Sequence, residues 1–277
     1  MTQAVHFTTS GGLPRIGRLD GDTITDAGPA TPQGFIPDQE GWDRVAAASG
    51  PVHALTEVTL LPPVRPGKIL AIGLNYRSHV VETNLAHPDV PVVFAKFPSS
   101  VTGPFDEIVV PREETRPDYE GEVGIVIAKR GYRIPAEKAW DYVGGFTAVN
   151  DVSGRRAQLE TPMRQFTLGK SFDTFTPIGP AIVSVEAVDL DQLTVQTRLA
   201  GELVQDGHFR DLIFDVPALL EYLSRGVTLE PGDLIPTGTP GGVGDERTPP
   251  LYLRDGDVVE VSVGGVGTLR NAVRKEL

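Results

Sequence analysis

Residues 118–128 read DYEGEVGIVIA, so a group of carboxylates runs directly into an apolar stretch. The apolar part, residues 123–127, is short and rich in Val and Ile, which favours a buried β-strand. On an extended chain Glu120 and Glu122 point to the same face, roughly 7 Å apart. Two carboxylates placed in this way repel each other unless water or a cation lies between them. The stretch therefore predicts a strand whose end is either solvated or part of a cation site.

A third carboxylate follows the next apolar strand signal along the chain. Residues 144–149 read as a strand, and Asn150 leads from it to Asp151. Carboxylate oxygens are hard ligands, which favour Mg²⁺, with Mn²⁺ or Ca²⁺ as alternatives. The spacing in sequence leaves open whether the three carboxylates converge.

The chain as a whole is dense in residues that turn the backbone. It has 31 Gly and 24 Pro among 277 residues, together about 20% where average usage gives about 12%. This density argues against coiled coils and helical bundles and favours short strands joined by tight turns. We expect a mainly β, α+β fold with a few covering helices and a loop at 176–180. The expected strands are 4–8, 15–19, 68–72, 92–97, 121–128, 144–149, 181–185, 193–199, 233–237 and 258–263, and the expected helices are 42–48, 76–85, 136–142 and 216–224.

A natural linker divides the sequence into two parts. Residues 61–67 carry three Pro and one Gly, a composition typical of a connection between domains. Before it, short strand signals alternate with turns, whereas apolar density rises after it. We therefore expect a small β-rich N-terminal domain over residues 1–64 and a main domain over residues 65–277.

Composition and charge exclude several classes of function. The net charge of −12 and the pI of about 4.9 argue against nucleic acid or an anionic membrane as a partner, since both need a basic face. The chain has no Cys, which excludes disulfides, zinc–thiolate sites and cysteine nucleophiles. The first residues lack the pattern of a signal peptide, and no apolar stretch approaches the ~20 residues of a membrane span. We expect a soluble, cytoplasmic protein.

Two further groups are suited to acid–base chemistry. His79 and Glu82 are three residues apart, so on a helical turn the carboxylate orients the imidazole. Such a pair can deprotonate water, and a plain surface contact is the alternative. Lys170 lies in an apolar, turn-rich segment, where it can stabilise an enolate or extend to solvent. The Gly-rich run 237–244 lacks the pattern of a nucleotide-binding loop, but its backbone N–H groups can hold a carboxylate.

Together these segments resemble the fumarylacetoacetate hydrolase superfamily, in its acylpyruvate hydrolase branch. Six motifs follow one another in the order of that family, with His79 and Glu82 after the first: GLNY at 73–76, FAK at 94–96, DYEGE at 118–122, NDVSGR at 150–155, GKSFD at 169–173 and TGTP at 237–240. The resemblance spans residues 68–273. It implies a mixed β-sandwich roll of the fumarylacetoacetase C-terminal type, usually in a homodimer, and a divalent metal held by Glu120, Glu122 and Asp151.

The resemblance also implies a reaction. The expected activity is hydrolysis of a C–C bond in an acylpyruvate-like or 1,3-diketo acid, with His79 and Glu82 activating water, and the metal and Lys170 stabilising an enolate. A decarboxylase, isomerase or hydratase of a 2-oxo acid is the alternative, because fold does not decide the reaction. A second alternative is a non-catalytic binding protein. The residues expected to contact the small oxo acid substrate are Tyr76, Arg155, Gln158 and Thr239, with Arg155 suited to a bidentate grip on its carboxylate.

Four residues depart from the usual pattern of the family. These are Ala200, His208, Phe209 and Arg156. If these side chains approach the cleft, they make it more basic and more aromatic than in other members.

Overall fold

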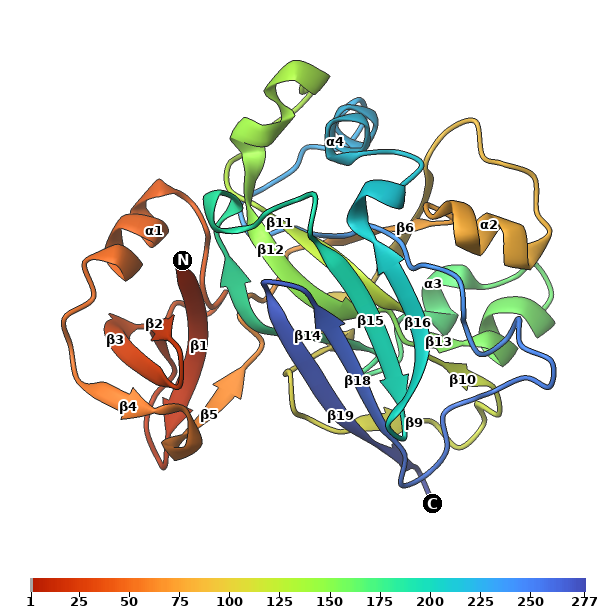
Figure 1. The fold of residues 1–277 in the computed structure, drawn as a ribbon, viewed down its shortest axis with the longest axis horizontal. Coiled ribbons are helices and arrows are strands. Elements are labelled where there is room, and N and C mark those ends of the chain that lie inside the picture. Colours follow the sequence, from red (N-terminus) through yellow and green to blue (C-terminus); the bar gives the residue numbers. More distant parts are fainter. Residues whose placement is uncertain (1) are drawn as a thin grey trace.

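The computed structural model describes residues 2–277, and its strands form two large sheets and one small one (Figure 1). The large sheet has 12 strands in the order β4 (Val52–Ala54), β3 (Thr23–Pro29), β2 (Arg15–Asp20), β1 (Gln3–Thr9), β14 (Thr176–Val183), β12 (Val143–Asn150), β11 (Gly121–Ile127), β17 (Leu234–Pro236), β6 (Ile69–Gly73) and β7 (Val92–Lys96), with β5 (Val58–Leu61) beside β1 and β8 (Val101–Thr102) beside β14. The second sheet has the order β16 (Glu202–His208), β15 (Thr194–Leu199), β18 (Val258–Val263), β19 (Gly267–Lys275) and β9 (Ile108–Val110). The strands β10 (Pro117–Asp118) and β13 (Ser153–Gly154) form the small sheet.

The helices are few and short. They are α1 (Gln39–Ala46), α2 (Arg77–Thr83), α3 (Phe166–Gly169) and α4 (Val216–Ser224). The segment Ala136–Tyr142 forms 3₁₀ turns, and Arg156–Glu160 forms a π-helical turn. No helix within residues 2–277 is long and apolar enough to cross a membrane.

The main core lies between the two large sheets. Alternate side chains of β11, such as Val123 and Ile125, pack in one apolar cluster with Val195 and Val261 of the second sheet. The sheets approach closely where β11 begins, since a Cβ at Gly121 would lie 2.2 Å from Oγ1 of Thr197. The opposite face of β11 is covered as well, which explains why its sequence from residue 123 to residue 127 is apolar rather than alternating.

The N-terminal strands extend the large sheet. Strand β1 pairs antiparallel with β14 at two positions, and Ala4, Ile16 and Phe35 share an apolar cluster with Ile178 and Leu234 of the main domain. In Figure 1 these strands form a lobe beside the rest of the molecule, next to α1. The division at residue 64 stays a prediction, because the lobe has turns and strands of its own and also shares apolar packing with residues beyond 64.

Most predicted elements are present, and the misses have a physical reason. Helix α4 occupies the predicted residues, with Asp215 accepting a hydrogen bond from the Ala218 N–H at 3.0 Å as N-cap. The predicted loop at 176–180 is wrong: these residues are the first part of buried strand β14. Its two Pro and one Gly suggest a loop, but pairing with β12 and β8 on either side holds the segment extended. Nine strands were not predicted. In β3, β16 and β19 polar residues dilute the apolar alternation. The other six, of two to four residues each, are too short to show an alternation: β4, β5, β8, β9, β10 and β13.

Candidate active site

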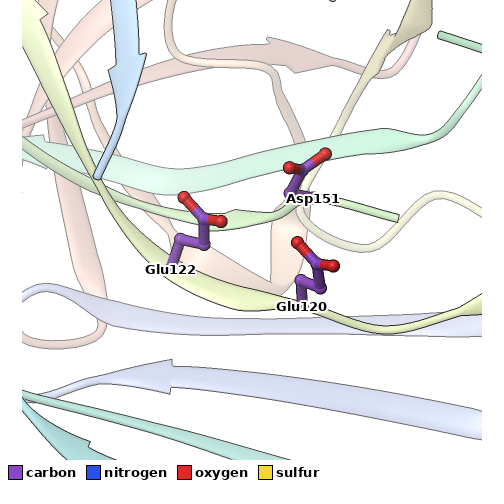
Figure 2. A group of neighbouring side chains, drawn as sticks. All are labelled: Glu120, Glu122 and Asp151. Carbon is purple, nitrogen blue, oxygen red and sulfur yellow. The ribbon is translucent and has the colours of Figure 1, made fainter. Parts of the chain in front are cut away.

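The three predicted carboxylates converge at one end of β11 and β12. Antiparallel pairing sets Gly121 opposite Asn150, and the Asp151 N–H donates to the Glu120 carbonyl at 2.8 Å. An oxygen from each of Glu120, Glu122 and Asp151 lies within 4.8 Å of the others, and all three side chains are buried. Figure 2 shows the three carboxylates around a common space. The solvated strand end, the alternative to a cation site, is therefore excluded.

Two of the three carboxylates are paired with buried cations. Lys170 Nζ lies 2.6 Å from Glu120 Oε2 and 2.9 Å from Asp151 Oδ2, and Arg155 Nη2 lies 2.6 Å from Glu120 Oε1. Burial by itself would raise the pKa of Glu120, but Lys170 and Arg155 outweigh it and lower that pKa to about 2. Lys170 is buried, so the alternative of a lysine extending to solvent is wrong.

Glu122 has no cationic partner within residues 2–277. Its carboxylate accepts one hydrogen bond, from the Gly238 N–H at 2.8 Å. Burial raises its pKa well above the usual range, and the neighbouring charges of Asp151 and Glu120 add to this effect. A buried carboxylate without a counter-charge is costly, and three oxygen ligands around one space suit a hard divalent ion. The residues present therefore fit the predicted metal.

A further charged residue of the site, Lys96, was assigned no role from sequence. Its ammonium is buried and donates to Asp151 Oδ1, to the Phe175 carbonyl at 2.9 Å and to the Val152 carbonyl at 3.3 Å. All three N–H donors are thus used, one of them on Asp151. A lysine inside the apolar strand signal at 92–97 was the available clue, since lysines are almost never fully buried without a partner.

The predicted dyad forms on α2. His79 Nδ1 lies 2.6 Å from Glu82 Oε1, and Glu82 Oε2 accepts from the Gly242 N–H at 2.6 Å. His79 is largely buried and lines a pocket, so the alternative of a plain surface contact is wrong. With Nδ1 held by Glu82, Nε2 is the nitrogen left to react.

One pocket, with a cavity of about 190 Å³, brings most predicted site residues together. Its wall includes His79, Glu120, Glu122, Arg155, Gln158, Lys170 and Thr239. Glu82 and Asp151 are hydrogen-bonded to His79 and Lys170 of this wall. Tyr76 is not on the pocket wall: its side chain is fully buried and packs in the main core, so its contact with the substrate stays a prediction.

The polar atoms of Arg155 and Thr239 are already engaged within the protein. Arg155 Nε and Nη2 donate to Asp118 Oδ2 at 2.9 and 2.7 Å, and Nη1 donates to Gln158 Oε1 at 3.1 Å. The Thr239 hydroxyl donates to the Gly121 carbonyl and accepts from Gln205, both at 2.8 Å. The predicted bidentate grip of Arg155 is therefore not available in this structure. Contact of Gln158 and Thr239 with substrate stays a prediction.

The Gly-rich run 237–244 does hold carboxylates, but they belong to the protein. Besides the bonds from Gly238 to Glu122 and from Gly242 to Glu82, the Gly244 N–H donates to Asp118 Oδ1 at 2.8 Å. The loop thus orients Glu122 of the acidic triad, the dyad carboxylate and the partner of Arg155 at once. The four residues that depart from the family pattern line no part of this pocket: Ala200, His208, Phe209 and Arg156.

Known proteins resemble this chain over most of its length. Residues 68–274 match the model of the fumarylacetoacetate (FAA) hydrolase C-terminal region. The chain is 43% identical over 232 residues to oxaloacetate tautomerase FAHD2A, mitochondrial, of Homo sapiens (83% of this chain, 74% of the relative), and 45% identical over 229 residues to oxaloacetate tautomerase YisK of Bacillus subtilis strain 168 (80% and 75%). A solved fumarylacetoacetate hydrolase from psychrophilic Exiguobacterium antarcticum has a TM-score of 0.84 and 38% identity, with both chains fully covered.

Proposed function

The chain belongs to the fumarylacetoacetate hydrolase family, and from that premise we propose that it is a metal-dependent tautomerase of a 2-oxo acid. One observation carries the proposal: the dyad histidine, a buried lysine and two of the three converging carboxylates, Glu120 and Glu122, line one pocket. Interconversion of keto and enol forms needs a base at C3 and a proton donor at the oxo oxygen. The names of two relatives with more than 40% identity support this reaction over hydrolysis.

The residues of the chain can move the proton without any co-reactant, since the enol and keto forms differ only in its position. His79 Nε2 is the base that takes the proton from C3, and Glu82 stabilises the resulting imidazolium. Burial lowers the pKa of Lys170, but Asp151 and Glu120 outweigh it and raise that pKa, so Lys170 stays an ammonium that donates to the oxo oxygen. A divalent ion held by Glu120, Glu122 and Asp151 would supply Lewis-acid polarisation of the oxo group.

Hydrolysis of a C–C bond is the second candidate. The observation in its favour is the same dyad, because an imidazole oriented by Glu82 with Nε2 free is also suited to activating water. A non-catalytic binding protein has little support, since both the dyad and the triad are present in full.

The decisive experiment follows the ultraviolet absorbance of enol oxaloacetate as it converts to the keto form, with protein and Mg²⁺ or with protein and EDTA. We expect acceleration over Mg²⁺ alone and its loss in EDTA. The variant His79→Gln should be about 10²- to 10⁴-fold slower, the usual contribution of a general base. The matched control is His208→Gln, which lies outside the pocket. No acceleration over Mg²⁺ alone would contradict the proposal.

Product analysis separates the alternatives. The Mg²⁺-loaded protein is incubated with acetylpyruvate and with oxaloacetate. Pyruvate with acetate would indicate hydrolysis, CO₂ would indicate decarboxylation, and unchanged carbon skeletons are expected for a tautomerase. The cytoplasmic location and the homodimer expected from sequence are proposals of the same kind. Light scattering on the purified protein tests the dimer.

A further inference from the structure

The pocket has an apolar half that a small dicarboxylic acid such as oxaloacetate would leave unfilled. Its walls there are formed by Ile72, Leu74, Leu85, Val92, Phe94 and Phe166. An apolar cavity of about 150 Å³ is enough to bind benzene, and this pocket measures about 190 Å³. Val92 and Phe166 keep 39% and 36% of their surface exposed, so an apolar ligand group placed between them would remove apolar surface from water.

The charges at the polar end are suited to a single carboxylate. The buried acids there are Asp118, Glu120, Glu122 and Asp151, and the buried cations are Lys96, Arg155 and Lys170. A bound divalent ion requires Glu122 to be ionised. These seven groups then sum to one negative charge, which the ion would convert to one positive charge. One substrate carboxylate neutralises it.

A second carboxylate would find no counter-charge. The Lys and Arg residues on the pocket wall are Arg155 and Lys170, and the structure over residues 2–277 pairs both with acids. The wall also includes two acids: Asp245, which is paired with Arg116, and the exposed Glu246, which repels an anion. An ionised group moved into the apolar half would lose its hydration without compensation.

From these observations we infer, resting on the proposed tautomerase function, that the preferred substrates are 2-oxo monocarboxylic acids with an aryl or branched alkyl group on C3. The carboxylate and oxo group lie at the triad end, and the C3 substituent lies against Val92, Phe94 and Phe166. Phe94 and Phe166 have ring centroids 6.5 Å apart at 54°, a spacing of aromatic pairs into which a further ring can pack edge to face. The reaction is still the transfer of one proton between C3 and the oxo oxygen.

Isothermal titration of the Mg²⁺-loaded protein with phenylpyruvate and with pyruvate tests the subsite by binding alone, because the two acids differ only in the ring. We expect phenylpyruvate to bind about ten- to a hundredfold more tightly, as burial of an aromatic ring predicts. The variant Phe166→Ala should remove most of this difference and leave the pyruvate affinity unchanged. The matched control is Leu168→Ala, on the same helix and 43% exposed, outside this pocket, which should keep the difference.

The outcomes distinguish this inference from the function on which it rests. Equal affinities for the two acids, or equal effects of Phe166→Ala and Leu168→Ala, would overturn the inference while oxaloacetate tautomerisation stands. Failure to accelerate either enol, of oxaloacetate or of phenylpyruvate, would overturn both. A higher kcat/KM for phenylpyruvate than for oxaloacetate, lowered by Phe166→Ala alone, would support it.

Discussion

Replacing Glu122 with glutamine should stabilise the metal-free protein and abolish its response to Mg²⁺. Glu122 is buried without a cation, and Asp151 and Glu120 repel it. A glutamine keeps the oxygen that accepts from Gly238 and removes the charge. Leaving a buried charged group without a partner costs at least about 1–3 kcal/mol, so the free energy of unfolding should rise by about that amount.

Thermal unfolding measures both effects. For a chain of this size 1 kcal/mol shifts Tm by about 2–4 °C, so Glu122→Gln in EDTA should melt about 2–12 °C above the wild type. Mg²⁺ at a hundredfold excess over Kd should stabilise the wild type by about 2.7 kcal/mol and leave the variant unchanged. The enzymatic rate of the variant should fall to that without metal.

The stability difference between Glu122→Gln and the wild type should also depend on pH, in a direction that the pKa of Glu122 sets. The folded-state pKa of Glu122 lies above its ordinary value of 4.5, so as pH rises the unfolded chain loses this proton first, and the wild type loses stability. Below about pH 4.5 the carboxyl is protonated in both states, and Glu122→Gln has no advantage. The advantage should therefore be larger at pH 8 than at pH 5.

The neighbouring substitution Glu120→Gln is the matched control, because it changes the same atoms two residues away. Glu120 is paired with Lys170 and Arg155, so its loss should lower the stability of the metal-free protein by about 1–3 kcal/mol. The two substitutions should thus shift Tm in opposite directions. Shifts of the same sign, or a retained Mg²⁺ response in Glu122→Gln, would refute the reasoning.

Three further predictions concern other parts of the site. Lys96→Met should destabilise the protein by about 3–5 kcal/mol in urea unfolding, because it leaves Asp151 short of a buried partner; adding Asp151→Asn should recover much of the loss, and an additive double variant would contradict the pairing. Glu82→Gln should lower kcat by about 10²- to 10⁴-fold with the Mg²⁺ affinity unchanged, since Glu82 acts through His79; a weakened Mg²⁺ affinity would argue otherwise. Binding of Mg²⁺ near neutral pH should release protons from Glu122, seen as titration heats that differ between buffers of unequal protonation enthalpy; equal heats would show that Glu122 is already ionised.

The triad could be predicted because its signals are local. A strand has a period of two residues, which sets Glu120 and Glu122 on one face, and a carboxylate that follows the next strand was the natural third ligand. The dyad followed in the same way from helical spacing. In each case residues close in sequence determine the geometry, so the sequence pattern is sufficient to predict which side chains lie together.

The partners of Arg155, Lys96 and Tyr76 could not be predicted. Arg155 bonds to Asp118, 37 residues away, and Lys96 bonds to Asp151, 55 residues away. Residue type predicts that a buried guanidinium or ammonium needs acceptors, but not which acceptors are within reach. The GLNY segment suggested a site tyrosine, whereas Tyr76 packs in the apolar core with residues from both large sheets, such as Ile125 and Val261.

The sequence by itself determined the mainly β class, about half of the strands, the three converging carboxylates and the dyad of this protein. Only the tertiary structure decided that Glu122 is the carboxylate without a cation, that Arg155 is committed to Asp118, and that half of the pocket is apolar. The reason is physical. Periodicity and turn chemistry act over a few residues, whereas charge balance and cavity shape depend on groups that strand pairing brings together from distant parts of the chain.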